Sequence, residues 1–283
     1  MGSLNSWLRR ICTQLAGILV AVAAFSSCSS AQPAPGLKPE TTKAFDKCLA
    51  EMETSILQKQ SSTQHFVLVD NQTQQDYKKL VSRGGVVIRE AEHCTVPDGL
   101  VHHWIAEAFI AGATNQDVLK VLKDVDDFPR IYSPRAVPPA KTISSSGDTR
   151  QIELTLKDTE YSITVAFDGT YDVHDGELDT LHAYSISRSL HMEIVEPKGK
   201  DYGIPWRLNT YWRLEQTPTG VFAECETISL TRDAPKGLGW LIHPFTTSIP
   251  KTSLQFTLTK TKNEVLCRQG STPCTTAQRT DNE

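Results

Sequence analysis

Residues 205–232 read PWRLNTYWRLEQTPTGVFAECETISLTR, and this stretch decides the fold. Residues 205–216 place Trp206, Leu208, Trp212 and Leu214 on one face, because side chains alternate across a strand. Residues 221–232 have a similar alternation, and the Thr-Pro-Thr-Gly segment between them has the composition of a turn. The sequence therefore predicts two long neighbouring strands.

A long helix is predicted after this strand pair. Residues 233–237 contain the proline and glycine that end the second strand, and residues 239–264 then show helical spacing with one interruption at Pro250. Ser248 can serve as the N-cap of the main segment, since proline is tolerated in a first helical turn. These elements together predict a helix laid against an antiparallel sheet.

Further strands and helices are predicted upstream. Helical patterns occupy residues 39–60, 73–82 and 116–132, the last of which we expect Pro129 to end early. Strand patterns occupy residues 85–89, 100–112, 136–145, 149–157, 161–173 and 180–196. Asp175-Gly176-Glu177 is expected to separate the last two of these strands. Long strands with short turns between them indicate an antiparallel meander.

The first 31 residues have the layout of a secretory signal. Arg9 and Arg10 precede an apolar run, and small residues follow it. The run is shorter than the about 20 apolar residues that span a membrane, although a retained anchor remains the alternative. Two processing routes are open, namely cleavage after Ala31 and lipidation of Cys28. We therefore expect an exported protein, periplasmic or extracellular, with any membrane anchoring through Cys28.

Charge and cysteine content narrow the classes of partner and site. The formal net charge is −4 and the basic residues are scattered, which argues against nucleic acid as a partner. Among the seven cysteines no Cys-x-x-Cys pattern occurs, so we expect neither a metal nor a cofactor. In an oxidising compartment the obvious disulfide pairs are Cys48 with Cys94 and Cys267 with Cys274. Cys225 is then left as a small buried residue.

Three stretches of the sequence are similar to those of a known family. They are the passage from His103-Trp104 to Asp126-Asp127-Phe128-Pro129, the TYWRLE and CETISLTRD hairpin, and the LIHPFTTSIPKTSL entry into the final helix. All three resemble the START-like superfamily, also called SRPBCC, which includes polyketide-cyclase, coenzyme-Q-binding and birch-pollen-allergen proteins. The resemblance is greatest to an exported bacterial subgroup of unsettled activity. It implies an α+β helix-grip fold, in which a curved antiparallel sheet wraps around a long C-terminal helix and leaves a cavity.

The resemblance also implies a domain organisation. Residues 1–31 are the leader, and residues 32–98 are a linker and N-terminal extension. Residues 99–265 are the START-like domain, and residues 266–283 are a flexible tail that can hold the Cys267–Cys274 disulfide.

Charged residues on apolar strand faces suggest where such a cavity lies. Glu224 and Glu226 share a face with Phe222, and Arg188 and His182 share a face with Tyr184. Buried charges are unfavourable unless paired, which predicts a polar-lined hollow or an Arg188–Glu pair inside it. The predicted ligand-binding residues are Trp104, Ile163, Val165, Phe167, His182, Tyr184, Arg188, Trp212, Glu224, Glu226 and Phe256. The alternative is that the charged residues face solvent and the tryptophans pack against outer helices.

The favoured function is binding of a hydrophobic small molecule or lipid in that cavity, as a carrier or sensor. One alternative is a cavity enzyme of the cyclase or dehydratase kind, with Glu226 and His182 doing acid–base work. The other is a non-catalytic structural or interaction domain. Adjacent His102 and His103 point to opposite faces of a strand and cannot bind one metal ion.

Overall fold

The computed structural model describes residues 38–61, 67, 84–160, 163–196, 205–232 and 239–274. The predicted leader with Cys28 and the helix predicted at 73–82 lie outside these residues. Leu37–Glu283 form one compact unit. No helix in the described part of the chain combines the length and apolar character needed to cross a membrane.

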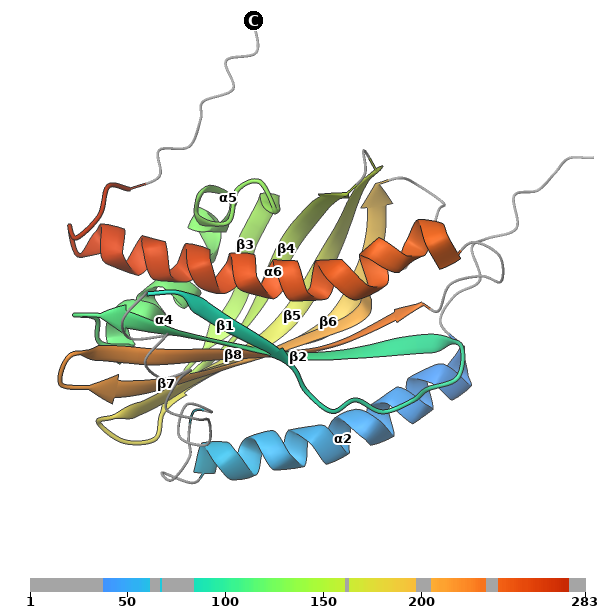
Figure 1. Ribbon diagram of the computed structural model, residues 1–283, viewed down its shortest axis with the longest axis horizontal. Helices are drawn as coiled ribbons and strands as arrows, with labels where there is room; N and C mark the ends of the chain where they lie inside the picture. The colour runs from blue at the N-terminus through green and yellow to red at the C-terminus, as the bar shows by residue number, and fades with distance from the viewer. Residues whose placement is uncertain are drawn as a thin grey trace, which may run out of the picture. The chain divides into compact units, whose positions relative to one another are not determined.

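An eight-stranded antiparallel sheet forms the body of this unit (Figure 1). Its strands are β1 (Val86–Glu90), β2 (Gly99–Ala111), β3 (Ala136–Ser146), β4 (Thr149–Glu160), β5 (Ile163–Glu177), β6 (His182–Glu196), β7 (Pro205–Thr217) and β8 (Gly220–Arg232). The spatial order is β1-β2-β8-β7-β6-β5-β4-β3, so β3 to β8 form a continuous meander. The predicted strand pair is β7 and β8, which lie in the middle of the sheet.

The C-terminal helix α6 (Gly239–Arg268) lies along the concave face of the curved sheet (Figure 1). Leu254 and Leu258 of α6 are buried in one hydrophobic cluster with Trp212 and Leu214 of β7 and with residues of β2. Two short helices, α4 (Asn115–Lys123) and α5 (Phe128–Ile131), lie between β2 and β3. The predicted α+β helix-grip fold is confirmed.

The helix boundaries differ from the prediction at both prolines. Helix α4 begins with a Thr114–Asp117 capping box and ends at Lys123, before Pro129, which instead occupies the first turn of α5. Helix α6 starts at Gly239 and continues through Pro250, so the prediction of Ser248 as its N-cap is wrong. A proline removes one helical hydrogen bond. The part of α6 that follows Pro250 is buried against the sheet, and this packing keeps the chain helical through the proline.

Strand β5 is longer than predicted. Asp175-Gly176-Glu177 belongs to β5, and the chain turns at residues 178–181. Gly176 pairs with Tyr184 of β6, and a Cβ atom at Gly176 would lie 2.4 Å from the Tyr184 hydroxyl. The glycine therefore makes room for a neighbouring aromatic ring rather than ending the strand.

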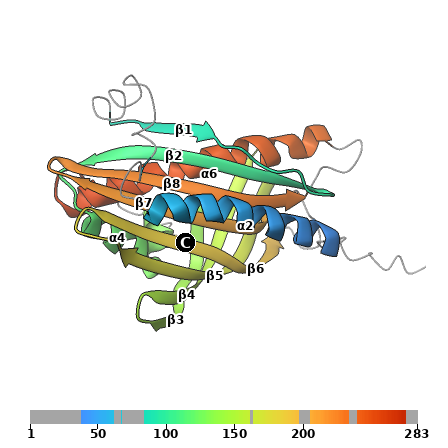
Figure 2. The same ribbon diagram turned by 90° about the horizontal axis from the view of Figure 1, so that it is seen from below.

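The convex face of the sheet is covered as well. Helix α2 (Pro39–Ser61) lies in front of this face in Figure 2 and buries Phe45 and Ile56 against it. The Cys48–Cys94 disulfide links α2 to the segment that precedes β2. Since β1 also pairs with β2, the structure has no domain boundary at residue 98. The N-terminal extension is part of the same compact unit as the sheet.

Candidate ligand-binding cavity

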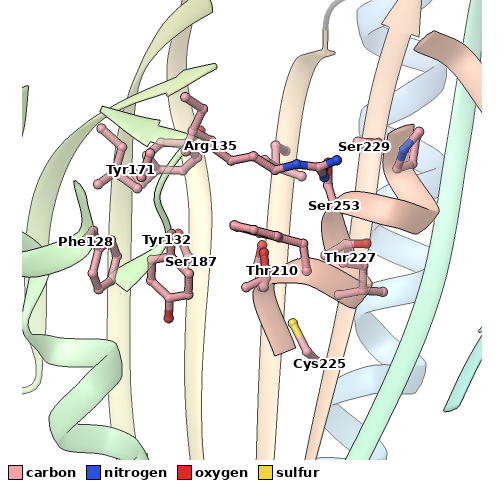
Figure 3. A pocket seen from close by; sticks show the side chains of 18 of the residues that line it. Phe128, Tyr132, Arg135, Tyr171, Ser187, Thr210, Cys225, Thr227, Ser229 and Ser253 are labelled. Carbon is pink, nitrogen blue, oxygen red and sulfur yellow. The ribbon is translucent and has the colours of Figure 1, made fainter. Parts of the chain in front are cut away.

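A cavity of about 280 Å³ lies between the concave face of the sheet and α6 (Figure 3). This volume is close to the lower end of the range for ligand pockets, about 300–1,000 Å³. Strands β3 to β8 and helices α4, α5 and α6 all contribute to its wall. Most of the wall is apolar, from Leu122, Phe128, Tyr132, Ala136, Ile152, Leu154, Leu156, Phe167, Val173, Leu208, Trp212, Ile249, Leu254 and Phe256.

Small side chains in the middle of the sheet leave this space empty. Ser187 of β6 pairs with Thr210 of β7, which pairs with Thr227 of β8, so three hydroxyl residues lie side by side. The next row contains Ser185 and Cys225 on either side of Trp212. A solid core would need larger apolar side chains at these positions, because protein interiors are close-packed.

Each of the two arginines in the wall has a carboxylate partner. The Arg135 Nη1 atom donates to the Ser253 hydroxyl at 2.7 Å and lies 3.5 Å from Asp158, and its guanidinium is 5.1 Å from the Phe256 ring centre. Arg150 is buried, binds Asp175 and donates to the Leu122 carbonyl oxygen at 3.1 Å. The positive charges of Arg135 and Arg150 are therefore both compensated by a nearby carboxylate.

Tyr171 of β5 brings a polar atom into the wall without a partner. Its hydroxyl makes no hydrogen bond within the described part of the chain, and its side chain is only 3% exposed. The ring lies over Gly169, where a Cβ atom would approach it to 2.5 Å. Burial raises the pKa of Tyr171 above its usual value, so the phenol stays neutral and available as a donor.

His102 and His103 do point to opposite faces, as predicted. The His102 Nε2 atom lies 2.8 Å from the hydroxyl of Thr231, a residue of the cavity wall. Burial, with a contribution from the charge of His93, lowers the pKa of His102 to about 4, so this ring is neutral near pH 7. His103 is on the convex face, where its Nε2 atom is 2.5 Å from Glu226.

The structure places Phe167, Trp212 and Phe256 in the cavity wall, as predicted. Trp104 lies on the same side of the sheet but outside the wall, with the Lys251 ammonium of α6 5.9 Å from its ring centre. Val165 packs against Phe167, Ile194 and Ile249, also outside the wall. The side chain of Ile163 lies outside the described residues.

The predicted placement of the charged residues in the cavity is wrong. Glu224 and Glu226 are buried on the convex face, where Arg213 binds both, at 2.6 Å in the case of Glu226. Arg188 pairs at 2.7 Å with Glu53 of α2, so the predicted Arg188–Glu pair inside the cavity is also wrong. Because α2 covers the convex face, buried charge there did not indicate a hollow.

His182 and Tyr184, the remaining two predicted residues, also lie outside the cavity wall. His182 binds Asp179 at 2.8 Å, and the Tyr184 hydroxyl lies 3.0 Å from His174. His182 and Glu226 have different partners, and the structure does not bring them together as an acid–base pair. The predicted catalytic pairing is therefore wrong.

The sequence interpretation missed Tyr171 and the row of hydroxyl residues. A signal existed, because Ser185 and Ser187 alternate with Ile186 and Arg188 along β6, opposite a threonine of β7. Small hydroxyl side chains at matching positions of neighbouring strands indicate a face that is not filled.

The cysteines pair in the structure as Cys48–Cys94 and Cys267–Cys274, and Cys225 is free and buried. The Cys225 thiol lies in the cavity wall, and burial raises its pKa well above the usual value. Among the described residues no cluster of three His, Cys, Asp or Glu side chains could hold a metal ion.

No protein-family model and no curated protein matches the sequence. Among solved structures, a STAR-related lipid transfer protein from Xanthomonas axonopodis is 16% identical, with 61% of this chain and 98% of that chain covered and a TM-score of 0.41. The Zhui aromatase/cyclase from a Streptomyces species is 15% identical, with 60% and 96% covered and a TM-score of 0.44. Truncated norcoclaurine synthase from Thalictrum flavum is 13% identical, with 61% and 98% covered and a TM-score of 0.38.

The arrangement of this chain, a curved antiparallel sheet around a C-terminal helix with a cavity between them, is the one the resemblance implied. The chain has the α+β helix-grip fold. The likeness to these solved structures carries no conclusion about a ligand. For this START-like chain, functional conclusions rest on the residues of its own cavity.

Proposed function

We propose that this START-like protein binds a hydrophobic small molecule or lipid in the cavity beneath α6, as a carrier or sensor. The observation that supports this is a mostly apolar wall around about 280 Å³ of space in the interior of the domain. An empty apolar cavity destabilises a protein, because its lining loses packing contacts. A ligand that fills the space would recover those contacts.

Phe167, Trp212 and Phe256 are the aromatic residues of the original prediction that we propose as ligand contacts. We also propose that the protein acts outside the cytoplasm. Support for export comes from the signal-like layout of residues 1–31 and from the two disulfides, which persist in oxidising compartments. In this proposal any membrane anchoring is through a lipid on Cys28.

Filling the cavity tests this function. Thr210→Trp introduces a large side chain into the middle of the cavity floor, whereas Thr219→Trp makes the same change in the exposed turn between β7 and β8. We expect the purified protein to take up a fluorescent sterol or another neutral apolar probe, Thr219→Trp to retain uptake, and Thr210→Trp to lose it. Circular dichroism confirms that both variants are folded. Equal uptake by the two variants, or no uptake of any apolar probe, contradicts the proposal.

A further inference from the structure

The three hydroxyl residues in the middle of the sheet form a regular row. Ser187, Thr210 and Thr227 are paired in register on β6, β7 and β8, so their spacing is that of neighbouring strands, about 4.8 Å. All three line the cavity, and none is fully buried. Within the described part of the chain none of these side chains makes a hydrogen bond. The row therefore offers three donors and acceptors to whatever fills the cavity.

Tyr171 adds a fourth unused hydroxyl on the next strand, β5. Figure 3 shows Tyr171 on the side of the cavity away from Thr227, with Ser187 and Thr210 between them. A buried hydroxyl without a partner is unfavourable relative to one that is hydrogen-bonded. Gly169 is required for the ring to lie where it does, since a Cβ atom there would overlap it. With a glycine at position 169, the Tyr171 ring can lie where its hydroxyl has no hydrogen-bond partner among the described residues.

The charges in the wall argue against an ionic ligand. Arg135 is next to Asp158, and Arg150 binds Asp175, so each of the two guanidinium groups has a carboxylate partner. An anionic head group would have to displace one of these carboxylates, and breaking a buried pair is strongly unfavourable. The unused groups of the row and of Tyr171 are neutral hydroxyls.

From these observations we infer that the cavity selects a neutral hydrophobic molecule that carries two or more oxygen atoms. Its skeleton contacts the apolar wall, and its oxygens bond with Ser187, Thr210, Thr227 and Tyr171. The two oxygens of a meta-substituted aromatic ring are separated by about one strand spacing, which suits adjacent members of the row. This inference rests on the proposed function and goes further, because it excludes plain hydrocarbons and fatty carboxylates as preferred ligands.

Three probes with one skeleton test the inference: naphthalene, naphthoresorcinol and naphthoate. Binding is measured by titration calorimetry and by quenching of tryptophan fluorescence. With about 1 kcal/mol for each hydrogen bond, the wild-type protein should bind naphthoresorcinol at least tenfold more tightly than naphthalene. Naphthoate should bind more weakly than naphthoresorcinol.

The decisive variant is Ser187→Ala/Thr210→Val/Thr227→Val, which removes the hydroxyls and nearly preserves the side-chain volumes. It should bind naphthalene as tightly as the wild type and lose the preference for naphthoresorcinol. Tyr171→Phe should lose part of that preference. The matched control is Thr142→Val/Ser144→Ala/Thr219→Val, at exposed positions, which should change nothing.

The outcomes separate this inference from the proposed function. If naphthalene binds and naphthoresorcinol gains nothing, or if its gain survives the triple variant, the inference is wrong and the apolar cavity still binds ligands. Tightest binding of naphthoate also overturns the inference. If none of the three probes binds the wild-type protein, both the proposed function and the inference fail.

Discussion

The two faces of the sheet are both buried, and they are buried in opposite ways. The concave face under α6 combines aromatic side chains with small hydroxyl residues and encloses a cavity. The convex face, on which α2 packs, contains the ionic cluster of His103, Arg213, Glu224 and Glu226, which is buried and outside the cavity wall. The four side chains of this cluster are joined by ion pairs, whereas the hydroxyls of the row Ser187, Thr210 and Thr227 have no hydrogen-bond partner within the described residues.

This difference shows that buried polarity alone does not locate a ligand site. In the convex cluster two carboxylates face two basic groups, and both ring nitrogens of His103 face oxygen atoms, Glu226 on one side and the Glu92 carbonyl on the other. Pairing in this way spares each buried charge the free-energy cost of standing uncompensated in the interior. Unpaired neutral hydroxyls beside empty space are the better indication of a ligand.

The largest effect is expected from Arg213→Ala on the convex face. The substitution leaves Glu224 and Glu226 buried without their shared cation, and we expect the free energy of unfolding to fall by about 3–5 kcal/mol. Urea unfolding followed by circular dichroism measures it. Removing the charges together, in Arg213→Met/Glu224→Gln/Glu226→Gln, should recover much of the loss. A single variant as stable as the wild type would show that the cluster is not a coupled ionic group.

The second-largest loss of stability is expected on removal of the Cys48–Cys94 disulfide, which links α2 to the segment before β2. Cys48 and Cys94 are 46 residues apart in sequence, and Cys267 and Cys274 are 7 apart. Loop entropy predicts a loss of about 4 kcal/mol for Cys48→Ser/Cys94→Ser and about 2 kcal/mol for Cys267→Ser/Cys274→Ser. Thermal and urea unfolding of the two double variants test this order. Probe binding in the concave cavity should survive at temperatures where the first variant is still folded.

Acid should weaken the convex face through Glu226. Burial raises the pKa of Glu226, but the hydrogen bond to His103 and the charge of Arg213 outweigh it and lower the pKa to about 2. The unfolded chain has the ordinary pKa of about 4.3, so the native state gains stability above that pH and loses it as the pH falls toward 2. The loss amounts to about 3 kcal/mol. Urea unfolding between about pH 5 and pH 2 should show it, and Glu226→Gln should flatten the slope.

An exposed carboxylate provides the control for this pH dependence. Glu193 has a largely exposed side chain, and Glu193→Gln should leave the slope unchanged. If Glu226→Gln retains the full wild-type slope, another group accounts for the acid sensitivity.

The smallest expected effect is on the concave face, from Gly169→Ala. The added Cβ would lie 2.5 Å from the Tyr171 ring, which must move into the cavity or away from the strand. We expect about 1–3 kcal/mol of destabilisation and weaker binding of the naphthoresorcinol probe. The same change at Gly85, where an added Cβ meets nothing within 4 Å, should be nearly neutral. Equal stability and binding in both variants would mean that Tyr171 is free to move.

Much of the fold followed from periodicity. Alternation along residues 205–232 correctly grouped Trp212 with Leu208 and Leu214, and Glu224 with Glu226, because the side-chain period of a strand is fixed. Trp206 was assigned to the wrong face, since a register shift at the start of β7 places it in the cluster of Tyr211 on the convex face. The spacing of apolar residues correctly predicted the helices at 39–60 and 239–264, apart from their ends. The ends were less accurate because packing on the sheet decides whether a helix continues through Pro250 or whether β5 continues past Gly176.

Less of the candidate site followed from the sequence. Phe167, Trp212 and Phe256 were predicted on the cavity wall, but the charged residues were assigned to the wrong face. Glu53, which pairs with Arg188, is 135 residues away from it in sequence, and no local pattern announces such a contact. Polar residues on an otherwise apolar sheet face can line a cavity or can form buried ion pairs. Only the elements that pack on that face distinguish these two cases.

By itself the sequence determined the strand faces, the final helix and the class of fold, because these depend on periods of two and 3.6 residues within one segment. Only the tertiary structure decided which face is hollow and which is solid. That outcome depends on where α2 and α6 pack on the sheet and on the combined side-chain volume of the neighbouring strands β6, β7 and β8. Volume and charge balance are properties of an assembled interior, so they are fixed only when distant segments meet.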